Sequence, residues 1–268
     1  MVISKKKYYY PREEYLIYYT SVDGDPIDAN GAFQSGIGSR YWDIRPKGSR
    51  HISDNLWAWV FDSPPTKVKG DVNDMEGLSA NTNLKSIDFS GCESLRIIGS
   101  QAFCECSNLE SVTFNEGLTT ILPMAFDSTG IKSITFPSTL QLLYKASFAS
   151  NRYLETVTFN VGMEFTDIAG DAYDGTFVGC TALRTVTLPT SVDTIIAGTF
   201  RNCTSLASVN LPSSIESIES QAFDGCSGLN TIAYDGTMAE WNAITKASNW
   251  HNGVPATVVH CTDGDITL

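Results

Sequence analysis

A ten-residue phrase recurs along this chain, and it constrains the fold more than any other feature. CTALRTVTLP begins at Cys180, and CTSLASVNLP begins at Cys203, with the apolar letters in the same places. Alignment on the pattern L-x-x-V-x-L/F gives copies separated by 25, 22, 23, 29, 23 and 23 residues. A period of roughly 20 to 50 residues is typical of a solenoid. The copies begin at Leu84, Leu109, Ile131, Leu154, Leu183, Leu206 and Leu229.

Each turn of this solenoid is predicted to contain two short strands. In the copy at Leu183, Val186 alternates with Thr185 and Thr187, which is the period of a strand with one face inward. Downstream apolar residues fit a second short strand or turn, followed by a tight coil. That coil carries a phenylalanine in phase with the repeat: Phe103, Phe126, Phe148, Phe177, Phe200 and Phe223. A turn of about 23 residues cannot bury its own apolar face, so neighbouring turns must stack about 4.8 Å apart.

A small polar or thiol residue precedes each copy by three positions, and we call this position the slot. It is predicted to hold Cys106, Ser128, Asn151, Cys180, Cys203 and Cys226. The chain has seven cysteines, an odd number, so they cannot all pair within it. Parallel Cβ vectors in stacked turns are poor disulfide geometry. We expect the slot cysteines to be buried free thiols that pack as small hydrophobic side chains.

The outward positions of the predicted main strands form a row of small polar side chains, which is the candidate binding surface. The candidate residues are Ser111, Thr113, Ser133, Thr135, Thr156, Thr158, Thr185, Thr187, Ser208 and Asn210. Solenoids commonly bind partners along such a face. The simpler interpretation, favoured for most of the row, is a solvated sheet of good strand formers. The position before the row alternates in charge, so adjacent turns are predicted to bring opposite charges together: Lys85, Glu110, Lys132, Glu155 and Arg184.

Both ends of the chain depart from the repeat and are predicted to be caps, because terminal turns would otherwise expose apolar faces. The predicted organisation is a β-rich cap over residues 1–80, repeats over 81–232, and a cap with a short helix and strand over 233–268. Thr237 and Glu240 have the spacing of a helix capping box. The N-terminal region also contains aromatic residues that form either cap core or a second candidate binding surface: Tyr8, Tyr9, Tyr10, Trp57 and Trp59.

No motif for catalysis, metal binding or a cofactor is evident, so none of these sites is predicted. The three histidines, His51, His251 and His260, have no metal-binding spacing. One long step carries Asp167, Asp171 and Asp174, which could hold a calcium ion, but insertions of this kind are usually solvated loops. The alternative that remains open for an enzyme is an active site assembled from residues that are distant in the sequence.

Charge and hydropathy exclude two classes of partner. The net charge is −12; residues 1–70 carry 10 basic and 8 acidic side chains (+2), and residues 71–268 carry 8 and 22 (−14). An acidic repeat region is unsuited to nucleic acid or to an anionic membrane surface. No apolar run approaches the roughly 18 to 20 residues of a membrane span. The start MVISKKKYYYPREEYL lacks the apolar core of a signal peptide, so a cytoplasmic protein and a trimmed secreted one both fit.

The repeat consensus LxSVTLPxSVxxIxxxAFxxCxxL resembles that of the BspA-type leucine-rich repeat proteins. The segments EYLIYYTSVDGDPI and GTMAEWNAITKASNWHNGVPATVVHCTDG are similar to segments that often flank those repeats. The resemblance implies a right-handed leucine-rich-repeat coil, capped at both ends, in a secreted or surface protein of bacterial type. It also implies adhesion to a protein partner such as a host extracellular matrix or surface protein.

These observations define a leading function and two alternatives. The leading hypothesis is a non-enzymatic binding module, extracellular or at the cell surface, that engages a protein. The first alternative is a glycan-binding protein that uses exposed N-terminal aromatic residues. The second is an enzyme or a sensor accessory. A broad polar face favours a protein partner, an aromatic platform favours a glycan, and a pocket with converging titratable groups favours an enzyme.

Overall fold

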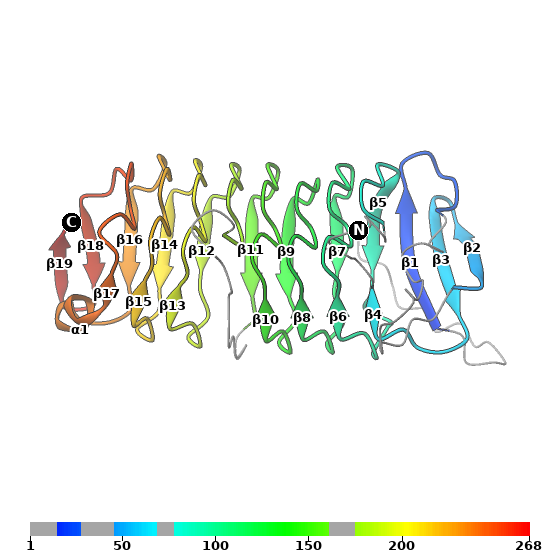
Figure 1. The fold of residues 1–268 in the computed structure, drawn as a ribbon, viewed down its shortest axis with the longest axis horizontal. Helices are drawn as coiled ribbons and strands as arrows, with labels where there is room; N and C mark the ends of the chain where they lie inside the picture. The colour runs from blue at the N-terminus through cyan, green and yellow to red at the C-terminus, as the bar shows by residue number, and fades with distance from the viewer. Residues whose placement is uncertain (1–14, 28–45, 69–77, 161–174) are drawn as a thin grey trace.

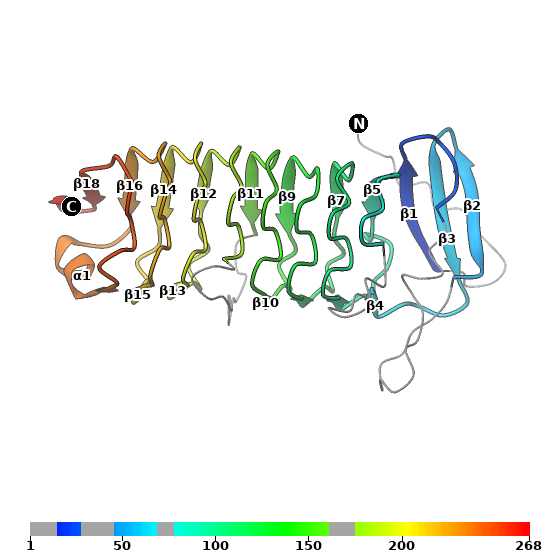
Figure 2. The same ribbon diagram turned by 45° about the horizontal axis from the view of Figure 1, so that its top comes forward.

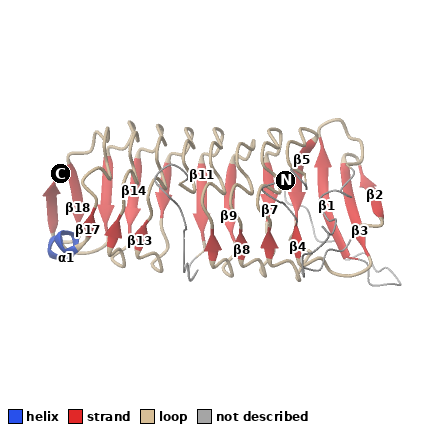
Figure 3. Cartoon of the chain, in the orientation of Figure 1, coloured by secondary structure: helices blue, strands red, loops and turns tan. Residues whose placement is uncertain are grey.

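The chain forms an elongated β-solenoid in which strands lie side by side along the long axis (Figure 1). The computed structural model describes residues 15–27, 46–68, 78–160 and 175–268. Within these ranges the regular structure is strand, apart from the short helix α1, Met238–Ala243 (Figure 3). The predicted solenoid architecture is confirmed.

The main sheet is a parallel ladder that receives one strand from each turn. In Figure 1 its strands follow one another in chain order, and in-register pairs such as Ile134 with Val157 and Val186 with Val209 point inward. The strand pairing is interrupted between β7 and β9, where the backbone bond from Lys132 N to Glu110 O, 3.3 Å long, links the residues directly before the two strands. The strands are β5 (Leu84–Asp88), β7 (Ser111–Thr113), β9 (Ser133–Phe136), β11 (Thr156–Phe159), β12 (Thr185–Thr187), β14 (Ser208–Leu211), β16 (Thr231–Tyr234) and β18 (Val258–Cys261).

A second parallel ladder of two-residue strands lies on the other side of the turns, which confirms the predicted second strand. Its strands are β4 (Lys67–Val68), β6 (Ile97–Ile98), β8 (Thr120–Ile121), β10 (Leu142–Leu143), β13 (Thr194–Ile195), β15 (Ser217–Ile218) and β17 (Thr245–Lys246). The ladder runs from β4 to β10 and again from β13 to β17. Between β10 and β13 lies the 29-residue step, part of which (161–174) is outside the described residues.

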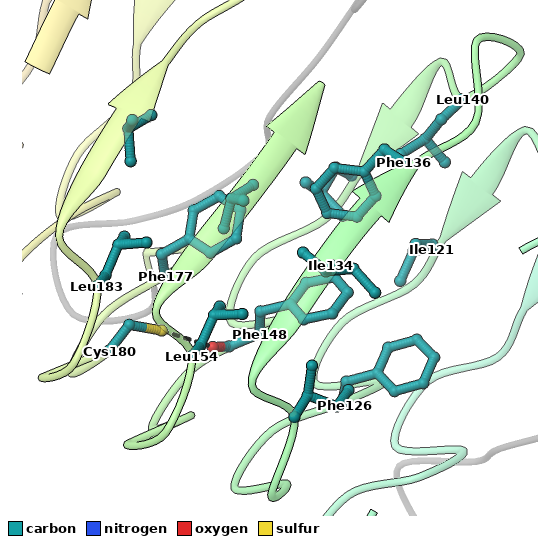
Figure 4. Packing of buried hydrophobic residues seen from close by; sticks show 14 of the residues in the cluster. Ile121, Phe126, Ile134, Phe136, Leu140, Phe148, Leu154, Phe177, Cys180 and Leu183 are labelled. Atoms are coloured by element: carbon teal, nitrogen blue, oxygen red, sulfur yellow. Dashed lines mark hydrogen bonds between the residues drawn. The ribbon is translucent and has the colours of Figure 1, made fainter. Parts of the chain in front are cut away.

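The repeated phenylalanines form a stacked column through the core, as their common phase predicts. Successive ring centroids from Phe103 to Phe223 are 5.0 to 6.0 Å apart with nearly parallel planes. Figure 4 shows Phe126, Phe148 and Phe177 in this column, with Phe136 beside Phe148. Each of these rings is almost completely buried. Each turn therefore supplies the apolar surface on which the next turn packs.

The backbone passes through the left-handed region two residues after each phenylalanine of this column. Glycine occupies this position at Gly179 and Gly225, both with φ of +72°. Other turns hold non-glycine residues there: Glu105, Ser128, Ser150 and Asn202, with φ from +55° to +60°. An L residue in this conformation costs roughly 1–2 kcal/mol, so the tight coil is imposed by stacking and not by local preference.

The slot holds a different residue from the predicted one in the turn that enters β9. Thr129 is buried there, and its hydroxyl donates to Asn151 Oδ1. Ser128 instead takes the left-handed position and donates to Asp127 Oδ1. The prediction of Ser128 was wrong because this turn is one residue shorter between phenylalanine and strand, and the slot keeps its distance from the phenylalanine.

The N-terminal end of the main sheet is covered by antiparallel strands β1 (Tyr15–Ser21), β2 (Gly48–Ser53) and β3 (Leu56–Phe61). β1 pairs with β5 on one edge and with β3 on the other. Tyr19 stacks on Trp59 at 4.3 Å in the core between them. Trp59 Nε1 donates to the carbonyl oxygen of Ile27, and the Tyr19 hydroxyl accepts from the Ile27 N–H.

The C-terminal end is covered by helix α1 and by β19 (Gly264–Thr267), which pairs antiparallel with β18 (Figure 2). The predicted capping box is present, because the Thr237 hydroxyl accepts from Glu240 N and the Glu240 carboxylate accepts from Thr237 N. Trp241 and Trp250 are buried, and Trp250 meets Phe223 edge-on at 6.0 Å. Two indole rings thus end the phenylalanine column.

Candidate functional site

The structure places all ten predicted binding residues on the outward face of the main sheet, in two columns. Backbone pairing aligns Ser133, Thr156, Thr185 and Ser208 in the first column. In the second column Thr158 aligns with Thr135, and Thr187 with Asn210. Eight of the ten are exposed, and Ser208 and Asn210 are half-buried. The Asn210 amide donates to Asp235 Oδ2, so this end of the face is partly closed by its own hydrogen bond.

The charged positions beside the face pair across neighbouring turns, as their alternation predicts. Lys132 Nζ lies 3.0 Å from Glu110 Oε2, and Arg184 Nε lies 3.7 Å from Glu155 Oε2. The hydrogen bond from Lys132, followed by its charge, lowers the pKa of the Glu110 carboxyl. These pairs are solvent-exposed and contribute at most about 1 kcal/mol each. Each of these two pairs brings together one positive and one negative side chain beside the face.

Of the N-terminal tryptophans, the structure describes Trp57 and Trp59, and both pack in the cap. Trp59 is completely buried, and half-buried Trp57 donates from Nε1 to the carbonyl oxygen of Gly24. Tyr8, Tyr9 and Tyr10 lie outside the described residues. Of the two interpretations of the Trp57–Trp59 pair, the structure confirms cap core.

One exposed aromatic residue at the face was missed by the sequence interpretation. Tyr153 is 63% exposed where the chain enters β11, and every other aromatic side chain in the described ranges is at least half-buried. The sequence carries a signal for it, because the residue directly before the first leucine is small or polar in the neighbouring copies. Their residues at this position are Asn108, Gly130, Ala182, Ser205 and Gly228.

The cysteine thiols are poor nucleophiles. All seven cysteines are unpaired, and six are buried. Burial raises the pKa of Cys106, Cys180 and Cys226 to about 12, and that of Cys203 well above its usual value. These thiols stay protonated at neutral pH, and a protonated thiol does not attack an electrophile.

The histidines lie outside strands β7 to β14, which carry the candidate face. His260 Nδ1 lies 2.9 Å from Asp265 Oδ1 at the exposed end of the sheet, while burial lowers the pKa of His251. Across the described ranges, His, Cys, Asp and Glu side chains form no group of three or more that could hold a metal ion. Asp167, Asp171 and Asp174 lie outside those ranges. In the same ranges, no helix is long and apolar enough to cross a bilayer.

Sequence comparison places the repeats in a known class. A family model described as "BspA type Leucine rich repeat region" matches residues 78–176 and 170–245, with six copies of the repeat. A comparison with curated proteins finds no match.

Solved structures of bacterial leucine-rich repeat proteins resemble this fold. One from Eubacterium ventriosum is 21% identical, with a TM-score of 0.56, over 77% of this chain and 52% of its own. One from Bacteroides ovatus is 16% identical, with a TM-score of 0.43, over 82% of this chain and 76% of its own. A leucine-rich cell surface protein from Faecalibacterium prausnitzii is 18% identical, with a TM-score of 0.34, over 60% and 66%. The chain thus spans about half the length of the Eubacterium protein.

Proposed function

Because the chain belongs to the BspA-type leucine-rich repeat family, we propose that it is a non-enzymatic binding module whose outward sheet face engages a protein partner. The family and the bacterial neighbours suggest a protein-interaction or surface module, and no enzymatic role follows from the fold. The finer proposal is an adhesion module, extracellular or at the cell surface, for a host extracellular matrix or surface protein. It takes no cofactor.

The observation that carries this proposal is the continuity of the face. From β9 to β14 the first column stays in register, and the second column is paired from β9 to β11 and from β12 to β14, so a partner can contact several turns without meeting a change in backbone direction. The exposed hydroxyls of Thr156, Thr158, Thr185 and Thr187 can each donate and accept hydrogen bonds. Paired charges border the hydroxyls, and an aromatic ring stands beside them at Tyr153. This mixture suits a broad protein contact with a polar rim.

A glycan partner has less support. The glycan alternative depended on exposed aromatic residues of the N-terminal region. Trp59 is completely buried and Trp57 is half-buried under the Gly24 carbonyl, so neither offers an open ring face for a sugar. We therefore do not advance a glycan-binding function.

The test is a double substitution in the middle of the face. Thr158→Lys with Thr185→Lys places two long cations on the columns, and exposed substitutions should change stability by no more than about 0.5 kcal/mol each. Binding is measured by surface plasmon resonance against a panel of purified extracellular-matrix proteins. We expect the double variant to lose about tenfold or more in affinity for any protein that binds the parent.

The matched control adds the same charge elsewhere. Thr245 and Ser248 are exposed at the short-strand side of the solenoid, and Thr245→Lys with Ser248→Lys should leave affinity unchanged. If the Thr158/Thr185 variant folds normally and binds as well as the parent, the sheet face is not the binding surface.

A further inference from the structure

We infer that Tyr153 and Arg152 form the anchor of the binding face, and that they receive a protein segment carrying an apolar side chain next to a carboxylate. This inference rests on the proposed function and names the chemistry of the partner at the same face. The two residues lie where the chain enters β11, immediately before the face residues Thr156 and Thr158.

The first observation is that the Tyr153 ring is exposed between two neighbouring turns that carry no large side chain at the same position. In the turn that enters β11, Arg152 and Tyr153 stand between the slot and the strand, but in the preceding turn Gly130 alone fills this interval. A Cβ at Gly130 would lie 2.5 Å from the carbonyl oxygen of Ser107, so backbone packing keeps this position free of a side chain. On the other side, Ala182 offers only a methyl group. The Tyr153 ring is exposed because neither neighbour can cover it.

The second observation is that no acidic residue in the described part of the chain pairs with Arg152. Among the cations of the neighbouring turns, Lys132 pairs with Glu110 and Arg184 pairs with Glu155. Arg152 is exposed and forms no ion pair with any other described residue. An exposed guanidinium with all of its donors available favours a planar carboxylate, which it can hold with two parallel hydrogen bonds. The complementary group on the partner is therefore acidic.

The third observation is that the backbone on both sides of the pair is fixed. Asn151 is fully buried, and its Nδ2 donates to the carbonyl oxygens of Phe126 and Ala149. Leu154 is also fully buried, and its N–H donates to Asn151 O at 3.1 Å. Only the two exposed residues stand between these fixed points, so binding has little backbone to order.

The residue types favour a protein over a polysaccharide. Tyrosine and arginine are the residues most enriched, with tryptophan, at the energetic centres of protein interfaces. The pair sits near the middle of the ladder, with paired charges and threonine hydroxyls around it that can form a surrounding polar rim. A protein segment can pack an apolar side chain on the exposed Tyr153 ring and reach Arg152 with the carboxylate beside it.

The experiment selects binders from a phage-displayed library of random peptides on the parent protein and measures the enriched peptides individually by isothermal titration. We expect them to share an acidic residue next to an apolar one. Tyr153→Ala should weaken their binding by about tenfold or more, while Tyr153→Phe should retain most of it. Arg152→Gln should weaken binding of the acidic peptides, but not of the same peptides with asparagine or glutamine replacing the acid.

Three results overturn the inference. The first is that no enriched peptide depends on Tyr153, and the second is that the enriched peptides lack acidic residues. The third is that polygalacturonate binds in an Arg152-dependent way while peptides do not, which would assign the anchor to an acidic glycan. If Thr158→Lys with Thr185→Lys abolishes matrix-protein binding while Tyr153→Ala and Arg152→Gln do not affect it, the face is correct and the anchor is wrong. If none of these variants changes matrix-protein binding, both the inferred anchor and the proposed function of the sheet face are wrong.

Discussion

The turn that enters β11 and the turns that enter β12, β14 and β16 form the same inter-turn bond with different chemistry. In the β11 turn, Asn151 Nδ2 donates to Phe126 O at 2.7 Å. In the later turns a thiol donates to the corresponding carbonyl, as Cys180 does to Phe148 O at 3.2 Å. Cys203 and Cys226 repeat this bond to Phe177 O and Phe200 O. The fold therefore requires a small donor of the right reach, and not a cysteine.

The same two regions differ in how tightly their turns are built. Around β11 the strands contribute Phe136 and Phe159 to the core, whereas β14 contributes Leu211 and the chain after β12 contributes Leu188. The left-handed position holds Ser150 before β11 and Asn202 before β14, but glycine at Gly179 and Gly225 before β12 and β16. The β11 turn thus has more aromatic packing than the turns that enter β12 and β14, and more backbone strain than the turns that enter β12 and β16.

The largest expected effect comes from the phenylalanine column. Phe148→Ala and Phe200→Ala should each lower the free energy of unfolding by about 3–5 kcal/mol, because each leaves a cavity in a fully buried stack. Phe148 should cost more, since Phe136 also meets it edge-on at 5.4 Å and such pairs add about 0.5–1.5 kcal/mol. Urea unfolding followed by circular dichroism measures both. Equal losses of unfolding free energy for the two variants would mean that the edge-on contact of Phe148 with Phe136 adds no stability to the β11 region.

The slot residue should give the next largest effect. Asn151→Ala leaves both Phe126 O and the Thr129 hydroxyl without this partner in the core, which should cost about 1–3 kcal/mol. Cys203→Ala removes one weak S–H donor and should cost about 1 kcal/mol. The free energy of unfolding of Asn151→Cys should lie between that of the parent and that of Asn151→Ala. A Cys203→Ala loss as large as that of Asn151→Ala would contradict the assignment of Asn151 as the stronger link.

The thiol turns should weaken in alkali through a titration that the asparagine slot lacks. Burial raises the pKa of Cys226 from 9.0 to about 12, so this thiol stabilises the fold fully below pH 9.0. That contribution is lost as the pH rises toward 12, because the unfolded chain ionises first. One thiol should account for about 1.4 kcal/mol per pH unit in this window.

The measurement is the urea midpoint between pH 8 and about pH 10.5, compared between the parent and Cys226→Ser. Serine keeps a donor in the slot but does not ionise in this range, so its stability should fall less steeply. Identical slopes for the two proteins would mean that Cys226 is not held protonated by the fold.

The smallest effect concerns the left-handed position. Ser150 has φ of +55° where the turns that enter β12 and β16 have glycine, so Ser150→Gly should relieve backbone strain and stabilise the protein by about 0.5–1 kcal/mol. Gly179→Ser should destabilise it, because Gly179 has φ of +72°. Melting midpoints of the two variants give opposite shifts if this assignment is right. A destabilised Ser150→Gly would show that the serine side chain contributes more than the strain costs.

Features that repeat or follow from local spacing were predicted from the sequence, and features that depend on contacts between turns or between distant segments were missed. The strands, the phenylalanine column and the Thr237–Glu240 box follow from periodicity and local spacing, which are visible without coordinates. The slot assignment failed at Ser128 because one deletion shifts the count from the strand but not from Phe126. Tyr153 was missed because its exposure depends on what the adjacent turns lack. The antiparallel pairing of β1 with β5 joins residues far apart in sequence, and no local pattern reports it.

Most of the slot bonds point toward the N-terminus of the chain. Cys180, Cys203, Cys226 and Asn151 each donate to a carbonyl of the preceding turn, whereas Thr129 donates forward to Asn151 Oδ1. Because a ribosome releases the N-terminal turns first, each of these four donors meets an acceptor that has already emerged. The solenoid can therefore extend one turn at a time during synthesis. A duplicated turn inserted into the gene would bring its own slot donor for the turn before it and its own carbonyl acceptor for the turn after it.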